Sequence, residues 1–128
     1  MKNISDEIGV FGASGQDGSL ILNFLLKKKN TVIAVVRKKN KYLSNLQTVY
    51  KKKLKIIISN KFVAKSYEKI LSGHKFKYIF FFAGYSKIPL SKREKKICNE
   101  SNYNIFKIFL NSCLKLNIKA KILYLSSS

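Results

Sequence analysis

Short runs of β-branched and aromatic residues alternate along this chain with segments in which apolar residues recur every three or four positions. Strands of four to eight residues separated by helices are typical of βαβ units, in which helical crossovers join parallel strands. The five predicted strands cover residues 8–11, 31–36, 54–58, 76–83 and 122–125. Helices are expected from Ser19 to the lysines at 27–29, within 41–53, over 62–71, and from the region of Pro89 and Ser91 through Cys113.

This alternation predicts an α/β protein with a doubly wound, Rossmann-like parallel sheet of about five strands in the order 3-2-1-4-5. The length of 128 residues suits a single domain covering residues 1–128. Hydrophobic residues make up 46% of the chain, which is enough to bury a core. The same length is too short for a cofactor domain together with a complete substrate domain.

The chain carries a formal net charge of +20, with 24 lysines and 2 arginines among its 26 basic residues. Such a charge is typical of nucleic-acid-binding proteins, but arginine, which binds phosphates and guanines best, is rare here. Lys, Asn and Ile all have codons rich in A and T, so a biased base composition explains most lysines as solvated surface residues. We therefore do not expect nucleic acid as the partner, although the positive field would attract a small anionic ligand.

No apolar run approaches the roughly 18 residues that a membrane span needs, and the polar N-terminus does not resemble a secretory signal. The sequence thus predicts a cytoplasmic protein with no membrane partner.

The cysteines and the single histidine carry little chemical signal. Cys98 and Cys113 fall on one predicted helix about 22 Å apart, which is too far for a disulfide, and neither has the neighbouring ligands of a metal site. We expect both cysteines to be buried apolar side chains. His74 lies in a predicted loop, and a surface position is favoured there over a catalytic one.

Three glycines follow the first predicted strand at the point where the first helix begins. Gly12, Gly15 and Gly18 give the spacing G-x-x-G-x-x-G. In this context the first glycine permits a sharp turn, the second lets a pyrophosphate approach the backbone, and the third lets the helix pack on the strand. The free N–H groups and positive dipole of the helix then bind phosphate. The alternative is a tight turn that binds no ligand.

The run Gly15-Gln-Asp-Gly18, with the helix and strand that follow it, resembles the extended short-chain dehydrogenase/reductase (NAD-dependent epimerase/dehydratase) family, and within it most closely the GDP-mannose 4,6-dehydratases. The resemblance implies a cofactor site formed by Gly12, Ser14, Gly15, Gln16, Asp17, Gly18, Arg37, Ser59, Asn60, Ala83, Gly84 and Ser86. It also implies that Ser128 is the catalytic hydroxyl residue at the end of the fifth strand. Ser59 and Asn60 depart from the family, which has an Asp and an apolar residue there near the adenine.

The end of the second predicted strand indicates which cofactor is bound. An acid at this position would bind the ribose 2′-hydroxyl and repel a 2′-phosphate. Arg37 and Lys38 stand here instead, and no acid occurs between Asp17 and Glu68. We therefore expect NADP, with NAD as the alternative.

The family's proton-transfer pair, a Tyr followed four positions later by a Lys, lies beyond the position of Ser128 in relatives. Tyr103 and Lys107 have this spacing but fall on the wrong predicted helix. We therefore expect the NADP-binding portion of a nucleotide-sugar dehydratase or epimerase of surface-polysaccharide synthesis, inactive as an isolated fragment. Whether the chain is a fragment, a split gene product or a degenerate protein stays open, and so do its activity as an enzyme and its assembly into a homo-oligomer. The alternative functions are a non-catalytic dinucleotide-binding module and, behind it, a basic nucleic-acid-binding protein.

Overall fold

A computed structural model describes residues 7–13, 15–61, 63–82 and 92–124 of the chain. Strands and helices alternate through it: β1 (Glu7–Phe11), α1 (Gln16–Lys27), β2 (Thr31–Val36), α2 (Lys41–Val49), β3 (Leu54–Ile58), α3 (Ala64–Ser72), β4 (Phe76–Phe81), α4 (Lys92–Lys115) and β5 (Lys121–Tyr124). The strands form one parallel sheet in the order β3-β2-β1-β4-β5. The predicted fold class and strand order are therefore confirmed.

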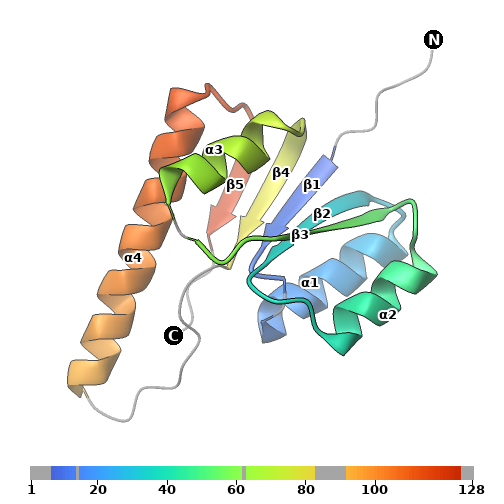
Figure 1. Ribbon diagram of the computed structural model, residues 1–128, viewed down its shortest axis with the longest axis horizontal. Helices are drawn as coiled ribbons and strands as arrows, with labels where there is room; N and C mark the ends of the chain where they lie inside the picture. Colours follow the sequence, from blue (N-terminus) through green and yellow to red (C-terminus); the bar gives the residue numbers. More distant parts are fainter. Residues whose placement is uncertain (1–6, 14, 62, 83–91, 125–128) are drawn as a thin grey trace.

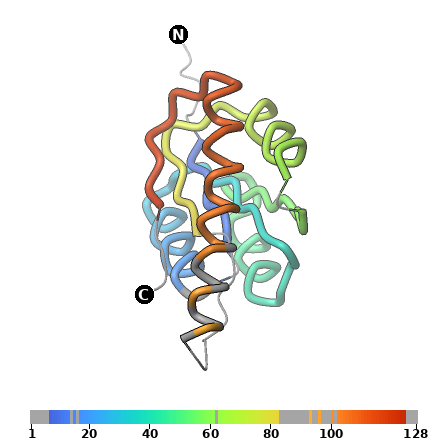
Figure 2. The backbone as a smooth tube through the Cα atoms, turned by 90° about the vertical axis from the view of Figure 1, so that its left-hand side faces the viewer, coloured from blue at the N-terminus to red at the C-terminus, as the bar shows by residue number. Residues whose placement is uncertain are grey.

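The sheet separates two helical layers, with α1 and α2 on one face and α3 and α4 on the other (Figure 1). Viewed from the side, α4 runs along its face of the sheet beside α3 (Figure 2). Of the two outer strands, β5 alternates between exposed and half-buried residues and β3 is buried only at Leu54, whereas β2 is buried from Val32 to Val36. Continuous burial of this kind is expected of a central strand covered on both faces.

The two faces of the sheet have different cores because successive strand residues point to opposite sides. Val10 lies with aliphatic residues of α1, α2 and β2, such as Leu22 and Leu43. Phe11, the next residue, lies on the other face in an aromatic cluster that includes Phe81 and Phe109. Both cores extend to the carboxyl ends of the central strands, where Phe11 and Phe81 lie in one core and Val36 in the other.

Helix boundaries differ from the sequence-based expectation by up to three residues. Helix α1 begins at Gln16, three residues before the predicted start at Ser19, because Gly15 occupies the N-cap position with extended backbone. Cys98 and Cys113 do lie on one helix, α4, as predicted. Cys113 is buried, and burial raises the pKa of its thiol to about 11; the side chain of Cys98 lies outside the described residues.

Candidate cofactor site

The turn between β1 and α1 has a backbone that favours glycine. Gly12 has a φ of 90°, in the region that L side chains rarely adopt. Its N–H donates to the Val35 carbonyl of β2 at 2.8 Å, and its own carbonyl accepts from Gly15 N–H at 3.1 Å. These bonds fix both ends of the turn, and α1 begins at Gln16, five residues after β1 ends at Phe11.

Gly18 is fixed by the close packing of α1 on this turn. A Cβ atom at Gly18 would lie 2.9 Å from Ala13 Cα and closer still to the Gly12 carbonyl oxygen, both of which are backbone atoms. Next to it, Ser19 Oγ donates to the Ala13 carbonyl at 3.0 Å. Neither backbone atom can move without distorting the turn, so only glycine fits at position 18.

Gly15 differs from the other two glycines of the turn, because neither backbone conformation nor packing requires glycine there. Its φ of −76° is open to any residue, and a Cβ there would meet Gly12 O at 3.5 Å, an ordinary contact. Glycine at this N-cap supplies no side-chain hydrogen bond to the first N–H groups of the 12-residue helix α1. The geometry therefore suits a phosphate that approaches the helix N-terminus, and a pyrophosphate fits this cradle.

The carboxyl ends of four neighbouring strands meet beside the turn. Backbone N–H groups link them in three bonds, from Gly12 to Val35 O at 2.8 Å, from Ser59 to Val36 O at 2.8 Å and from Phe82 to Phe11 O at 2.7 Å. Ligands of open α/β sheets bind at this edge, where the strand order reverses. The sheet thus brings the glycine turn, the end of β2 and the end of β3 together, as the sequence predicts.

The predicted site residues that the structure describes all lie along this edge. Arg37 directly follows β2 and is exposed, and so is Asn60, whereas Ser59 is half-buried. Asp17 is exposed in the first turn of α1, which Gln16 begins, although the side chain of Gln16 is not among those described. The predictions at Ser14, Ala83, Gly84, Ser86 and Ser128 lie outside the described residues.

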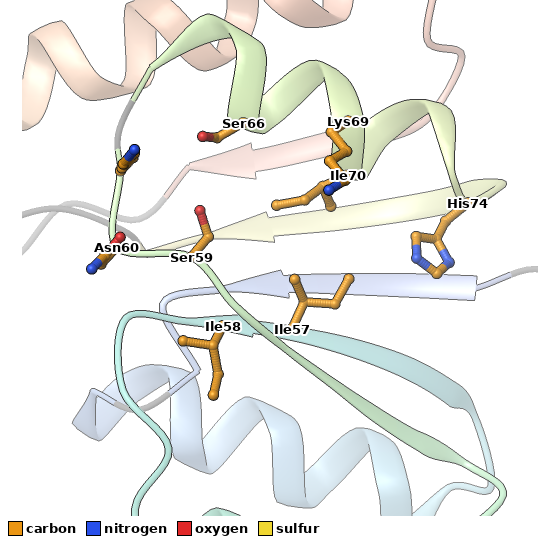
Figure 3. Close-up of a pocket in the computed structure, with 9 residues that line it drawn as sticks. Ile57, Ile58, Ser59, Asn60, Ser66, Lys69, Ile70 and His74 are labelled. Atoms are coloured by element: carbon orange, nitrogen blue, oxygen red, sulfur yellow. The ribbon is translucent and has the colours of Figure 1, made fainter.

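A groove of about 390 Å³ opens between β3 and α3 (Figure 3). Its lining consists of Ile57, Ile58, Ser59, Asn60, Lys61, Ser66, Lys69, Ile70 and His74. Ser59 and Asn60 place one end of the groove at the carboxyl edge of the sheet. The other end reaches the α3–β4 loop, so the groove runs along the outer strand. Of its lining, sequence reasoning identified only Ser59 and Asn60 as functional, because residues from α3 and its flanking loops share no sequence motif.

His74 closes the far end of the groove and is less exposed than the sequence suggested. Its Nδ1 lies 3.3 Å from Glu7 Oε1, its side chain is 12% exposed, and its ring lies 5.7 Å from that of Phe76. The expected loop position is correct, but the expected surface exposure is wrong, because Glu7 at the start of β1 and Phe76 on β4 cover the ring.

Tyr103 and Lys107 are both exposed on α4, the helix that precedes β5. The described residues contain no group of three metal-ligating side chains. Within the same residues, no helix has the length and apolar character needed to cross a membrane.

The parallel sheet and its glycine turn define a nucleotide-binding domain of the Rossmann class. The family model of the NAD-dependent epimerase/dehydratase family matches residues 8–128. The chain belongs to this family. Among curated proteins, no sequence matches it.

Solved structures share the fold at low sequence identity. UDP-glucose 4-epimerase from Bifidobacterium longum, in complex with NAD+ and UDP, has a TM-score of 0.80 at 21% identity over 95% of this chain. The enzyme from Stenotrophomonas maltophila, with bound NAD and formylated UDP-arabinopyranose, has a TM-score of 0.79 at 13% identity over 96%. The enzyme from Thermotoga maritima, with UDP-glucose, has a TM-score of 0.71 at 23% identity over 92%. In each case the matched region covers 37% of the epimerase.

Proposed function

We propose that this chain is the cofactor-binding portion of a nucleotide-sugar dehydratase or epimerase that resembles the GDP-mannose 4,6-dehydratases and uses NADP. The observation that carries the proposal is the glycine turn, above all Gly15. Backbone conformation explains glycine at position 12 and packing explains it at position 18, but position 15 is free for a larger residue. A pyrophosphate that approaches the N-terminus of α1 supplies the missing reason.

The preference for NADP is supported by the charge at the end of β2. Arg37 and Lys38 are exposed there, and the next acid along the chain is Glu68, on α3. A guanidinium offers a planar pair of donors to a phosphate, and the net charge of +20 adds a long-range attraction. Two of the similar epimerases are described with NAD, so the choice of NADP rests on this chain's own residues.

In this proposal the chain's residues bind and orient the cofactor. The turn at Gly12–Gly18 holds the pyrophosphate, Arg37 holds the adenosine end, and Ser59 and Asn60 border the adenine. When bound, NADP would supply reversible hydride transfer to and from the sugar. Ser128 is the proposed catalytic hydroxyl, and the sugar and the proton-transfer pair belong to the part of the fold that these residues do not cover. We therefore expect the 128 residues alone to bind NADP without turnover.

Titration calorimetry of the purified chain with NADPH and NADH tests the proposal. Arg37→Ala should weaken NADPH about tenfold, equivalent to about 1.4 kcal/mol, and change NADH less than about twofold, because only NADPH carries the 2′-phosphate. Lys119→Ala, which removes an exposed cation from the loop before β5, is the matched control and should change neither. Immeasurable binding of both nucleotides would overturn the proposal, and equal weakening of both by Arg37→Ala would overturn the preference for NADP.

A further inference from the structure

The outer edge of β3 presents backbone groups that the sheet does not use. β3 is the terminal strand of the sheet and pairs with β2. Val32 N–H donates to Lys53 O, and Ser59 N–H donates to Val36 O. Backbone groups of alternate strand residues point to the same side, so residues 53, 55, 57 and 59 face β2. Ile56 and Ile58 therefore direct their N–H and C=O groups outward.

The groove lies directly along this edge, on the α3 side of the sheet. Ile57 and Ile70 are the apolar side chains on this side, while Ser66 and Lys69 project from α3 (Figure 3). Ile58 points to the opposite side of the strand and is 59% exposed. A strand added beside β3 would therefore place alternate side chains in the groove and against Ile58, as in strand addition to an open sheet edge.

Charge determines which strand the edge accepts. Lys55, Lys61, Lys65 and Lys69 are all exposed on β3, α3 and the loop between them, and no acidic residue lines the groove. The acid on α3, Glu68, forms an ion pair with Lys115, in which Lys115 Nζ lies 3.3 Å from Glu68 Oε1. A second copy of this chain, with its own charge of +20, is repelled. An acidic segment is attracted.

We propose that the β3 edge and its groove bind an extended acidic peptide segment of a partner protein by β-strand addition. This surface is separate from the glycine turn, which follows β1 two strands away, at about 10 Å across the sheet. The proposal goes beyond the cofactor function. It needs no nucleotide, although the two sites approach each other at Ser59 and Asn60.

Fluorescence anisotropy with a labelled hexapeptide of alternating Val and Glu tests the proposal on the full chain. We expect saturable binding, which the same peptide with Lys in place of Glu should lose. A control peptide Val-Glu-Pro-Glu-Pro-Glu keeps all three Glu side chains but cannot complete the ladder, so it should bind at least about tenfold more weakly. Equal binding of the Pro peptide would overturn strand addition. Complete displacement by 10 mM inorganic phosphate at constant ionic strength would show a small-anion site and would also overturn it.

Two variants locate the peptide on β3. Lys69→Glu should weaken the peptide at least about tenfold, by charge reversal at the groove, whereas Lys27→Glu on α1, with the same change in net charge, should have little effect. Ile58→Pro removes one outward N–H at an edge position where proline is tolerated, and it should weaken the peptide while far-UV circular dichroism stays unchanged. Equal effects of Lys69→Glu and Lys27→Glu would overturn the proposal. NADPH titration of the same variants separates failure here from failure of the cofactor function.

Discussion

The ring and the hydroxyl of Tyr67 have opposite effects on the stability of the fold. Its ring lies 5.5 Å from that of Phe109 in an edge-on arrangement and 6.2 Å from that of Phe11, and the side chain is 3% exposed. Its hydroxyl has no hydrogen-bond partner in the described part of the chain. Burial raises the pKa of Tyr67 above the ordinary value of 10.0 because it disfavours the phenolate. The ring therefore stabilises the aromatic core, and the hydroxyl opposes that stabilisation.

Tyr67→Phe should raise the free energy of unfolding by about 1 kcal/mol, because it removes a buried, unpaired hydroxyl and keeps the ring. Urea denaturation at pH 7 measures the change, and Tyr103→Phe, at a tyrosine that is 62% exposed, should change little. The pKa of Tyr67 is higher in the folded chain than in the unfolded chain, so the folded chain keeps the phenol proton at pH values where the unfolded chain releases it. The free energy of unfolding is therefore unaffected by this titration below about pH 10 and falls as the pH rises further. The Phe variant should lack that part of the alkaline loss. A lower stability of Tyr67→Phe would show that the hydroxyl has a partner.

At the level of single residues, the glycine positions could be predicted and the groove could not. Gly12, Gly15 and Gly18 are local in sequence, and their spacing alone indicates the turn. Lys69 and His74 contribute to the groove because α3 packs beside the edge of the sheet, which no local pattern encodes. His74 is covered because the start of β1, 67 residues earlier in the chain, lies beside it.

The apolar periodicity of helix α1 predicts that the helix forms but not which of its faces is buried. Apolar residues at Leu20, Ile21, Phe24 and Leu25 indicate a helix, and a helix is present. Leu20 is nevertheless 65% exposed and Phe24 57% exposed, whereas Leu22 and Leu26 are buried. Apolar residues lie on more than one face of the helix. The three-to-four periodicity therefore predicts the helix, whereas the face that is buried depends on how the helix lies on β1 and β2.

The junction of β1 and α1 allows packing and ligand binding to be tested separately. Gly18→Ala should destabilise the fold by about 2 kcal/mol or more, because its Cβ meets backbone atoms of the turn. Gly15→Ala should cost no more than about 1 kcal/mol, the difference between Gly and Ala at an N-cap, yet abolish NADPH binding by blocking the phosphate. Thermal denaturation and NADPH titration measure the two effects.

Gly73→Ala is the matched control for both glycine variants. Its φ of −84° is helical, and its nearest Cβ contact would be an ordinary 3.4 Å to Lys69 O. It should bind NADPH as the unmodified chain does and unfold at a similar urea concentration. Unchanged NADPH affinity in Gly15→Ala would contradict the role assigned to this glycine.

Across the whole molecule, the charge of +20 opposes folding through mutual repulsion of lysines. Adding sodium chloride from 0.02 to 0.3 M shortens the Debye length from roughly 20 Å to under 8 Å, so the melting temperature should rise by about 5 °C. Differential scanning calorimetry measures it, with sucrose at equal osmolality as the uncharged control. A melting temperature that is unchanged or lower in salt would show that attractive pairs, such as the one between Lys115 and Glu68, outweigh the repulsion.

The sequence by itself determined the class of fold, the number and order of the elements, and the position of the glycine turn. These depend on local preferences: β-branched runs favour strands, three-to-four periodicity favours helices, and short alternation of the two admits few topologies. The tertiary structure decided which face of α1 is buried, how His74 is covered, and that β3 has a groove along its outer edge. Those features arise where segments distant in sequence pack together, and their contacts depend on side-chain shape in three dimensions, which a one-dimensional pattern does not record.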